Sequence, residues 1–174
     1  MKTLGAIFLV VISEIMADPE PRILLPSAEY IELYNLSGSP VSLNGYRLQV
    51  GKTVKTLPPA VLPPDGYLVL CDAADTALFP DSVITAGIPS MPALVNTGSV
   101  LTLLSPEGSV IHTVAYSDRW YGSTSKSGGG WSLEMTDPAN PCGRADNWRA
   151  SDDPSGGTPG RANSVRRPNP DHEP

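Results

Sequence analysis

The chain has few charged residues and few of the side chains that most often carry chemistry. Of its 174 residues, 17% are charged, and there are only two histidines and two cysteines. Catalysis by a histidine-activated nucleophile therefore has almost no candidates. Lysine and arginine number 12 against 18 acidic residues, and the resulting net charge of −6 makes nucleic acid and anionic lipid poor partners.

No apolar stretch is long enough to cross a membrane, so no membrane insertion is expected. The longest run, Thr3–Ile12, follows Lys2 and has the charge and length of a signal-peptide core. Cleavage after Ala17 would remove Ile12–Met16, which has the pattern of an edge strand. Three interpretations stay open: a secretory signal, a buried first strand, or a chain that begins close to the domain boundary.

The two cysteines, Cys71 and Cys142, have a spacing that fits neither a metal site nor a redox pair. In an oxidising compartment they can form a disulfide, which would restrict the unfolded chain by about 4 kcal/mol in the entropy model. We expect this disulfide, and two buried free thiols are the alternative.

Glycine and proline are abundant, with 16 and 19 residues, which is typical of a chain of short strands and turns. The segment Glu29–Asn35 alternates, with Ile31 and Leu33 pointing one way and Glu32 and the two tyrosines the other. This period of two predicts a half-buried strand.

Similar signals predict further strands and two tight turns. Asn44-Gly45 and Pro106-Glu107-Gly108 are the turn sequences. The expected strands are Tyr46–Val50, Tyr67–Cys71, Ser99–Leu104, Ser109–Ser117 and Trp131–Met135. A helix of at most two turns is expected within Asp72–Pro80. The pattern predicts an all-β, antiparallel sandwich of seven to nine strands with long irregular loops.

The tract Gly128–Ser164 has almost no hydrophobic period but carries tryptophan, proline and glycine, which we interpret as residues that fix an irregular path. Gly160 is expected to have a positive φ. The predicted organisation is residues 1–9 as a signal remnant or the start of the first strand, residues 10–164 as one domain, and residues 165–174 as a disordered linker or tail.

Six segments in order resemble the lamin tail domain family in its bacterial secreted form. They are ISEIMADP (12–19), EYIELYN (29–35), LPPDGYLVLC (62–71), GGWSLE (129–134), NW (147–148) and GTPGRANS (157–164). The resemblance implies an immunoglobulin-like sandwich without catalytic residues or cofactors. It also implies a non-catalytic accessory module at the cell surface or outside the cell, beside neighbouring domains of a longer protein.

The expected partner is a protein or a glycan. Trp120 and Tyr121 end a strand and enter the loop GSTSKSGGG, where aromatic rings can form a platform for a sugar or a side chain. The alternative is that one or both fold back over the end of the sandwich. Trp131 and Trp148 are interpreted as core residues. A carbohydrate- or calcium-binding module serving an attached hydrolase is the second functional hypothesis.

Other candidates are weaker. His112 is expected to face solvent on its strand. The carboxylates Glu29, Glu32, Asp146, Asp152 and Asp153 lack the spacing of a calcium loop, so no metal site is expected. Lys126 and Arg149 have acidic neighbours, which favours surface ion pairs over a phosphate site.

Overall fold

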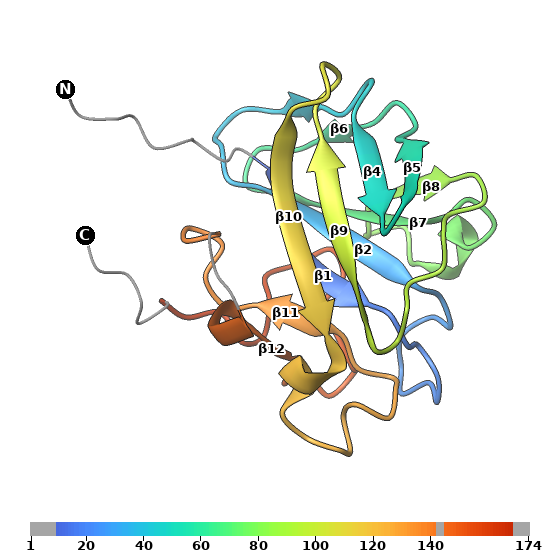
Figure 1. Ribbon diagram of the computed structural model, residues 1–174, viewed down its shortest axis with the longest axis vertical. Helices are drawn as coiled ribbons and strands as arrows, with labels where there is room; N and C mark the ends of the chain where they lie inside the picture. The colour runs from blue at the N-terminus through green and yellow to red at the C-terminus, as the bar shows by residue number, and fades with distance from the viewer. Residues whose placement is uncertain (1–9, 142–144, 169–174) are drawn as a thin grey trace.

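Two packed sheets form from the segments in which apolar residues alternate (Figure 1). The computed structural model describes residues 10–141 and 145–168. The larger sheet contains, in spatial order, β12 (Trp148–Ala150), β11 (Leu133–Met135), β1 (Val10–Met16), β2 (Tyr30–Asn35), β7 (Tyr67–Asp72) and β8 (Thr85–Ile88). The smaller sheet contains β10 (Val110–Ser117), β9 (Gly98–Leu104), β4 (Arg47–Val50) and β5 (Thr53–Thr56), and β3 (Val41–Ser42) pairs separately with β6 (Val61–Leu62).

The predicted all-β sandwich is confirmed. Within the described residues, every strand pair is antiparallel except β7 with β8, which is parallel. The described residues contain twelve strands, more than the predicted seven to nine, because β5, β8 and β12 are too short to show a clear alternation. Three short 3₁₀ helices complete the elements: η1 (Thr76–Leu78), η2 (Asp118–Tyr121) and η3 (Ala145–Asn147).

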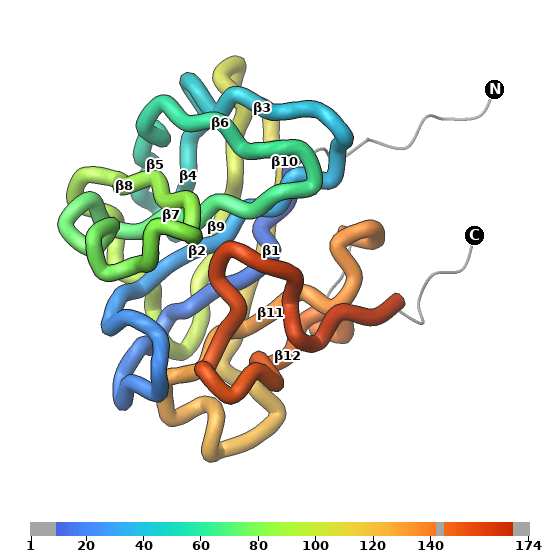
Figure 2. The backbone as a smooth tube through the Cα atoms, turned by 180° about the vertical axis from the view of Figure 1, so that it is seen from behind, coloured from blue at the N-terminus to red at the C-terminus, as the bar shows by residue number. Residues whose placement is uncertain are grey.

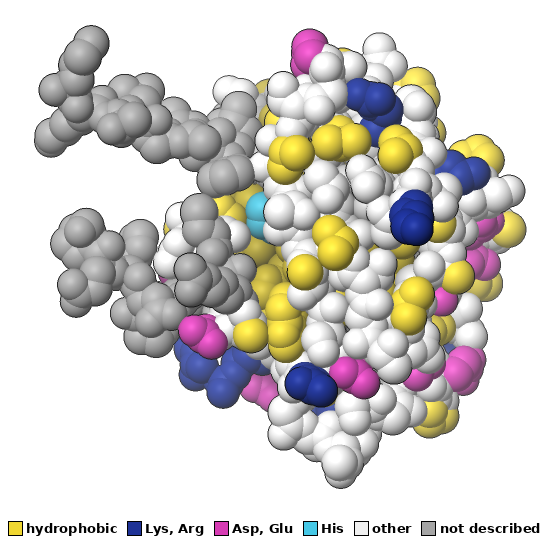
Figure 3. Space-filling view, viewed as in Figure 1, with side chains coloured by type: hydrophobic (Ala, Val, Ile, Leu, Met, Phe, Trp, Pro, Cys, Tyr) yellow, Lys and Arg dark blue, Asp and Glu magenta, His cyan; other side chains and the backbone are white. Residues whose placement is uncertain are grey.

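The main core lies between the two sheets. Ile31 and Leu33 of β2 point into it, as predicted, and belong to the same buried cluster as Leu48 and Leu101 of the smaller sheet; all four are fully buried. Hydrophobic side chains on the outer face of the smaller sheet are scattered rather than gathered into one patch (Figure 3). The hydrophobic effect therefore holds the sheets together through one interior layer.

β1 is a central strand, so the expectation of an edge strand is wrong. It pairs with β2 on one side and with β11 on the other. A register shift between Ile12 and Glu14 places Ile12 and Ile15 in the main core, while Glu14 lies among polar groups outside it. A protein cleaved after Ala17 would lack this strand, and the larger sheet would be divided.

The second face of the larger sheet is also buried, because the closing part of the chain crosses it (Figure 2). Tyr30 and Glu32, which the alternation assigned to the other face of a half-buried strand, are both 0% exposed. Residues 157–165, here called the strap, hydrogen-bond to side chains from three neighbouring strands. Gly160 in the strap has φ of +84°, which confirms the predicted positive φ.

Two further boundaries differ from expectation. The helix predicted within Asp72–Pro80 is reduced to η1, because Asp72 completes β7 and its carboxylate accepts the Ala74 amide in a tight turn. The domain does not end at Ser164, since Val165 is buried and the Arg167 amide donates to Thr136 O at 2.8 Å. Among the described residues no helix has the length and apolarity to cross a membrane.

Candidate binding site

Trp120 and Tyr121 lie in η2, which turns the chain across one end of the sandwich. The turn begins where Ser117 Oγ accepts the Arg119 amide at 3.3 Å, and it ends at Gly122 with φ of +64°. A left-handed residue of this kind favours glycine. The sequence therefore places both aromatic side chains directly after the long strand β10.

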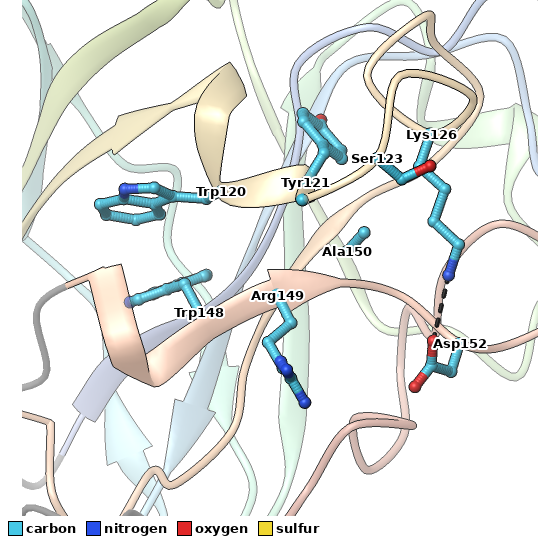
Figure 4. A pocket seen from close by; sticks show the side chains of 9 residues that line it. Trp120, Tyr121, Ser123, Lys126, Trp148, Arg149, Ala150 and Asp152 are labelled. Atoms are coloured by element: carbon cyan, nitrogen blue, oxygen red, sulfur yellow. Dashed lines mark hydrogen bonds and ion pairs between the residues drawn. The ribbon is translucent and has the colours of Figure 1, made fainter.

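A pocket of about 390 Å³ opens between η2, the loop that follows it and β12 (Figure 4). Its walls combine aromatic, charged and small side chains. They are Trp120, Tyr121, Gly122, Ser123, Lys126, Trp148, Arg149, Ala150 and Asp152. All nine come from two segments, residues 120–126 and 148–152, so the pocket exists only in the folded protein.

The aromatic wall is a pair of stacked indoles. Trp120 and Trp148 have ring centroids 6.0 Å apart and an interplanar angle of 30°. Trp148 is 2% exposed, which confirms its predicted place in the core, whereas Trp120 is only partly buried. Trp148 thus supports Trp120 from the core side, and the partly exposed Trp120 ring is available to a ligand.

Tyr121 does not share this role, because it folds back over the sandwich. It is 8% exposed and its hydroxyl donates to Trp131 O at 3.1 Å. Burial raises the pKa of this phenol, so it remains neutral. Of the two predicted platform residues, only Trp120 keeps a partly exposed ring. Tyr121 instead fixes the end of the following loop through its bond to Trp131.

Charged side chains form the rim opposite the indoles. Lys126 Nζ lies 3.0 Å from Asp152 Oδ1 and 4.5 Å from the centre of the Trp131 ring. Arg149 is exposed on β12. The sequence indicated surface ion pairs for these groups, and the Lys126 contact agrees. What the sequence missed is that Lys126, Arg149 and Asp152 meet at the same pocket as Trp120.

His112 is buried, not solvent-facing, so that expectation is wrong. It is 4% exposed, and its Nδ1 accepts the Ile12 amide at 3.0 Å. Burial lowers its pKa and favours the neutral ring. The histidine therefore links β10 to β1. Its contact with β1 shields its ring from water.

The loop carboxylates mostly stabilise turns. Asp153 accepts the amide and hydroxyl of Ser155 and pairs with Arg161 at 2.8 Å, and these bonds lower its pKa to about 2. Glu29 accepts the Leu94 amide at 2.8 Å. In the described part of the chain no group of three or more potential ligands is arranged to hold a metal ion.

Three glutamates that the sequence did not single out together lie side by side on the second face of the larger sheet. Glu134, Glu14 and Glu32 are direct register partners on β11, β1 and β2, and each is 0% exposed. Burial, and then the charge of Glu134, raises the pKa of Glu14 to about 7. Burial, and then the charge of Glu14, raises the pKa of Glu32 well above its ordinary value.

Cys71 is a buried free thiol on β7, packed with Met16, Tyr30 and Phe79. Burial, with nearby Asp75 and Asp72, raises its pKa to about 11. Cys142 lies outside the described residues. The structure records Cys71 as a free thiol and gives no support to the predicted disulfide.

The sequence model of the Lamin Tail Domain family matches residues 8–118, which is more than half of the chain. The match ends where η2 begins, so the closing tract with the pocket and the strap lies largely outside it. No curated protein matches the chain.

Proposed function

The chain belongs to the lamin tail domain family, and from that premise we propose that it is a non-catalytic interaction module of a secreted or cell-surface protein. It would act as an accessory domain that presents a binding surface beside other domains of a longer protein. Folds of this kind acquire their role from loops at the ends of the sheets.

The observation that carries the proposal is the accessible ring of Trp120 at the rim of the pocket. Trp148 supports this ring from behind, while Lys126 and Asp152 provide a donor and an acceptor within the same pocket. An aromatic face beside hydrogen-bonding groups is the usual composition of a binding hot spot. The pocket contains no histidine, and its serine, Ser123, is bonded to Ser125 Oγ at 2.7 Å. These features favour binding over catalysis.

A glycan is the second candidate for the partner, besides a protein side chain. The apolar face of a sugar ring can stack on Trp120, and its hydroxyl groups can bond to Asp152 and Arg149. The pocket volume of about 390 Å³ is within the range of small-molecule sites.

A panel of oligosaccharides tested for binding to the purified protein separates these partners. If a glycan binds, Trp120→Ala should weaken binding roughly thirtyfold. Leu24→Ala is the control, because Leu24 is 71% exposed and does not line the pocket. Equal binding by the wild type and Trp120→Ala would exclude this pocket as the site. Hydrolysis of a bound sugar by the purified protein would contradict the non-catalytic proposal.

A further inference from the structure

Glu134, Glu14 and Glu32, here called the glutamate row, are fully buried and lie apart from the binding pocket. These carboxyl groups are register partners on adjacent strands, a position in which like charges destabilise a sheet. Neither of the two ion pairs found among the described residues involves them. Three buried, unpaired negative charges in one row would be strongly unfavourable, so the row must be partly neutral.

The hydrogen bonds of Glu14 and Glu134 indicate which carboxyl group holds the proton. Glu14 Oε1 accepts two bonds, from the Tyr30 hydroxyl at 2.6 Å and from the Thr158 amide at 2.8 Å. Its other oxygen, Oε2, lies 3.2 Å from the Thr158 hydroxyl, and that hydroxyl lies 2.9 Å from Glu134 Oε1. A hydroxyl has one hydrogen and donates to one acceptor in a good geometry. The same hydroxyl also lies 3.4 Å from Asn163 Oδ1, so its one hydrogen cannot serve all three oxygens, and a proton on one of the two carboxyl groups would supply the missing donor.

Glu134 is already provided with donors. Its Oε2 accepts from the Ser164 hydroxyl at 2.7 Å and from the Val165 amide at 3.2 Å, so this carboxyl group is positioned as an acceptor. The consistent chain of bonds runs from a protonated Glu14 Oε2 to the Thr158 hydroxyl, and from that hydroxyl to Glu134 Oε1. The Thr158, Gly160 and Val165 amides and the Ser164 hydroxyl of the strap then all donate to carboxyl groups of the sheet.

We propose that Glu14 carries a proton in the native state and that this proton holds the strap, residues 157–165, closed over the larger sheet. Loss of the proton would place two negative oxygens against the Thr158 hydroxyl, which can satisfy only one of them. It would also add a second charge beside Glu134. We call this arrangement the latch: the strap is held against the larger sheet while Glu14 is protonated, and this contact is weakened when Glu14 ionises.

Other charged and titratable groups surround this latch. They are Tyr30, Glu32 and Glu134 on the sheet, Tyr67 on β7, Arg149 in register with Glu134 on β12, Arg161 and Asp153 paired at the edge of the strap, and Arg166 beside Tyr34 and Tyr67. None of the cations among them forms an ion pair with Glu14 in the described structure. The pKa of Glu14, about 7, places the change near neutral pH.

Amide hydrogen exchange of the strap in the full chain tests the latch. The protection factors of the Thr158 and Gly160 amides, corrected for intrinsic exchange, should fall at least about tenfold between about pH 5 and about pH 9 in the wild type. Glu14→Gln should keep them high at both pH values, because the amide of glutamine donates as the protonated acid does. Glu107→Gln is the charge-matched control on an exposed hairpin, and it should lose protection like the wild type.

Two results would overturn the proposal: constant protection in the wild type, or the same loss in Glu14→Gln as in the wild type. A ¹³C NMR titration of the glutamate side chains covers the case in which Glu14→Gln fails to fold. In the wild type, the Glu14 carboxyl should be protonated at about pH 5 and ionise near neutrality. An ionised Glu14 at about pH 5 would also refute the latch.

Discussion

The backbone amide of Gly160 donates to Oε2 of Glu32 at 2.7 Å, although the two residues are 128 positions apart. This bond joins the end of the domain to the middle of its larger sheet. The family match ends at residue 118, yet β11, β12 and the strap complete the sheet and cover it. The closing tract is therefore a structural layer rather than a tail.

Gly160 should not tolerate a branched side chain. Its φ of +84° is strained for other residues, and an added Cβ would lie 3.1 Å from Val83 Cγ2. We expect Gly160→Val to lower the free energy of unfolding by about 2 kcal/mol, measured by urea denaturation. Gly38→Val is the control, because nothing lies within 4 Å of a Cβ there. Equal effects of the two substitutions would contradict the account of Gly160.

The thiol of Cys71 should be free and unreactive. It is 0% exposed and burial raises its pKa to about 11, so little thiolate forms near neutral pH. We expect iodoacetamide to label Cys71 in unfolded, unreduced protein but not in native protein, as read by mass spectrometry. If no label enters Cys71 until a reductant is added, the bridge to Cys142 exists after all.

His112 should contribute stability that disappears in acid. Its folded pKa is lowered, so the unfolded chain binds a proton first as the pH falls below about 6.5. This contribution is present above that pH and is lost as the pH falls through the folded pKa, opposite in sign to the effect of Glu14. His112→Gln should remove it, because glutamine can accept the Ile12 amide without titrating. Identical slopes of stability against pH in both proteins would exclude this role.

The two stacked indoles should differ in their effects on stability. Trp148 is 2% exposed, so Trp148→Ala should destabilise the domain by roughly 3–5 kcal/mol. Trp120→Ala removes a partly exposed ring at the pocket rim and should have a clearly smaller effect on the midpoint of thermal unfolding. A larger loss for Trp120→Ala would mean that Trp120 is a structural residue and would weaken its assignment to binding.

Local sequence was sufficient to predict most strands, because each long strand shows its own alternation. It predicted the two faces of β2 correctly but could not show that the Glu32 face is covered, since the strap that covers it lies more than 120 residues away. The same limit applies to His112, whose burial depends on contact with β1.

One signal in the sequence was available for the glutamate row. Glu14, Glu32 and Glu134 are each the single charged residue of a mostly apolar strand. Such residues are rarely left unpaired in the interior. The pocket had no comparable signal, because only the folded chain brings Trp120 close to Arg149 and Asp152.

Removal of the strap tests most directly whether the strap is part of the folded core. Urea denaturation of the full chain should be compared with that of a chain ending at Gly156, which retains all twelve strands but loses the strap. We predict that the shortened chain loses its cooperative transition or has a much lower midpoint, because the three glutamates lose the strap donors that now satisfy them. An unchanged transition midpoint would show that the strap is not part of the folded core.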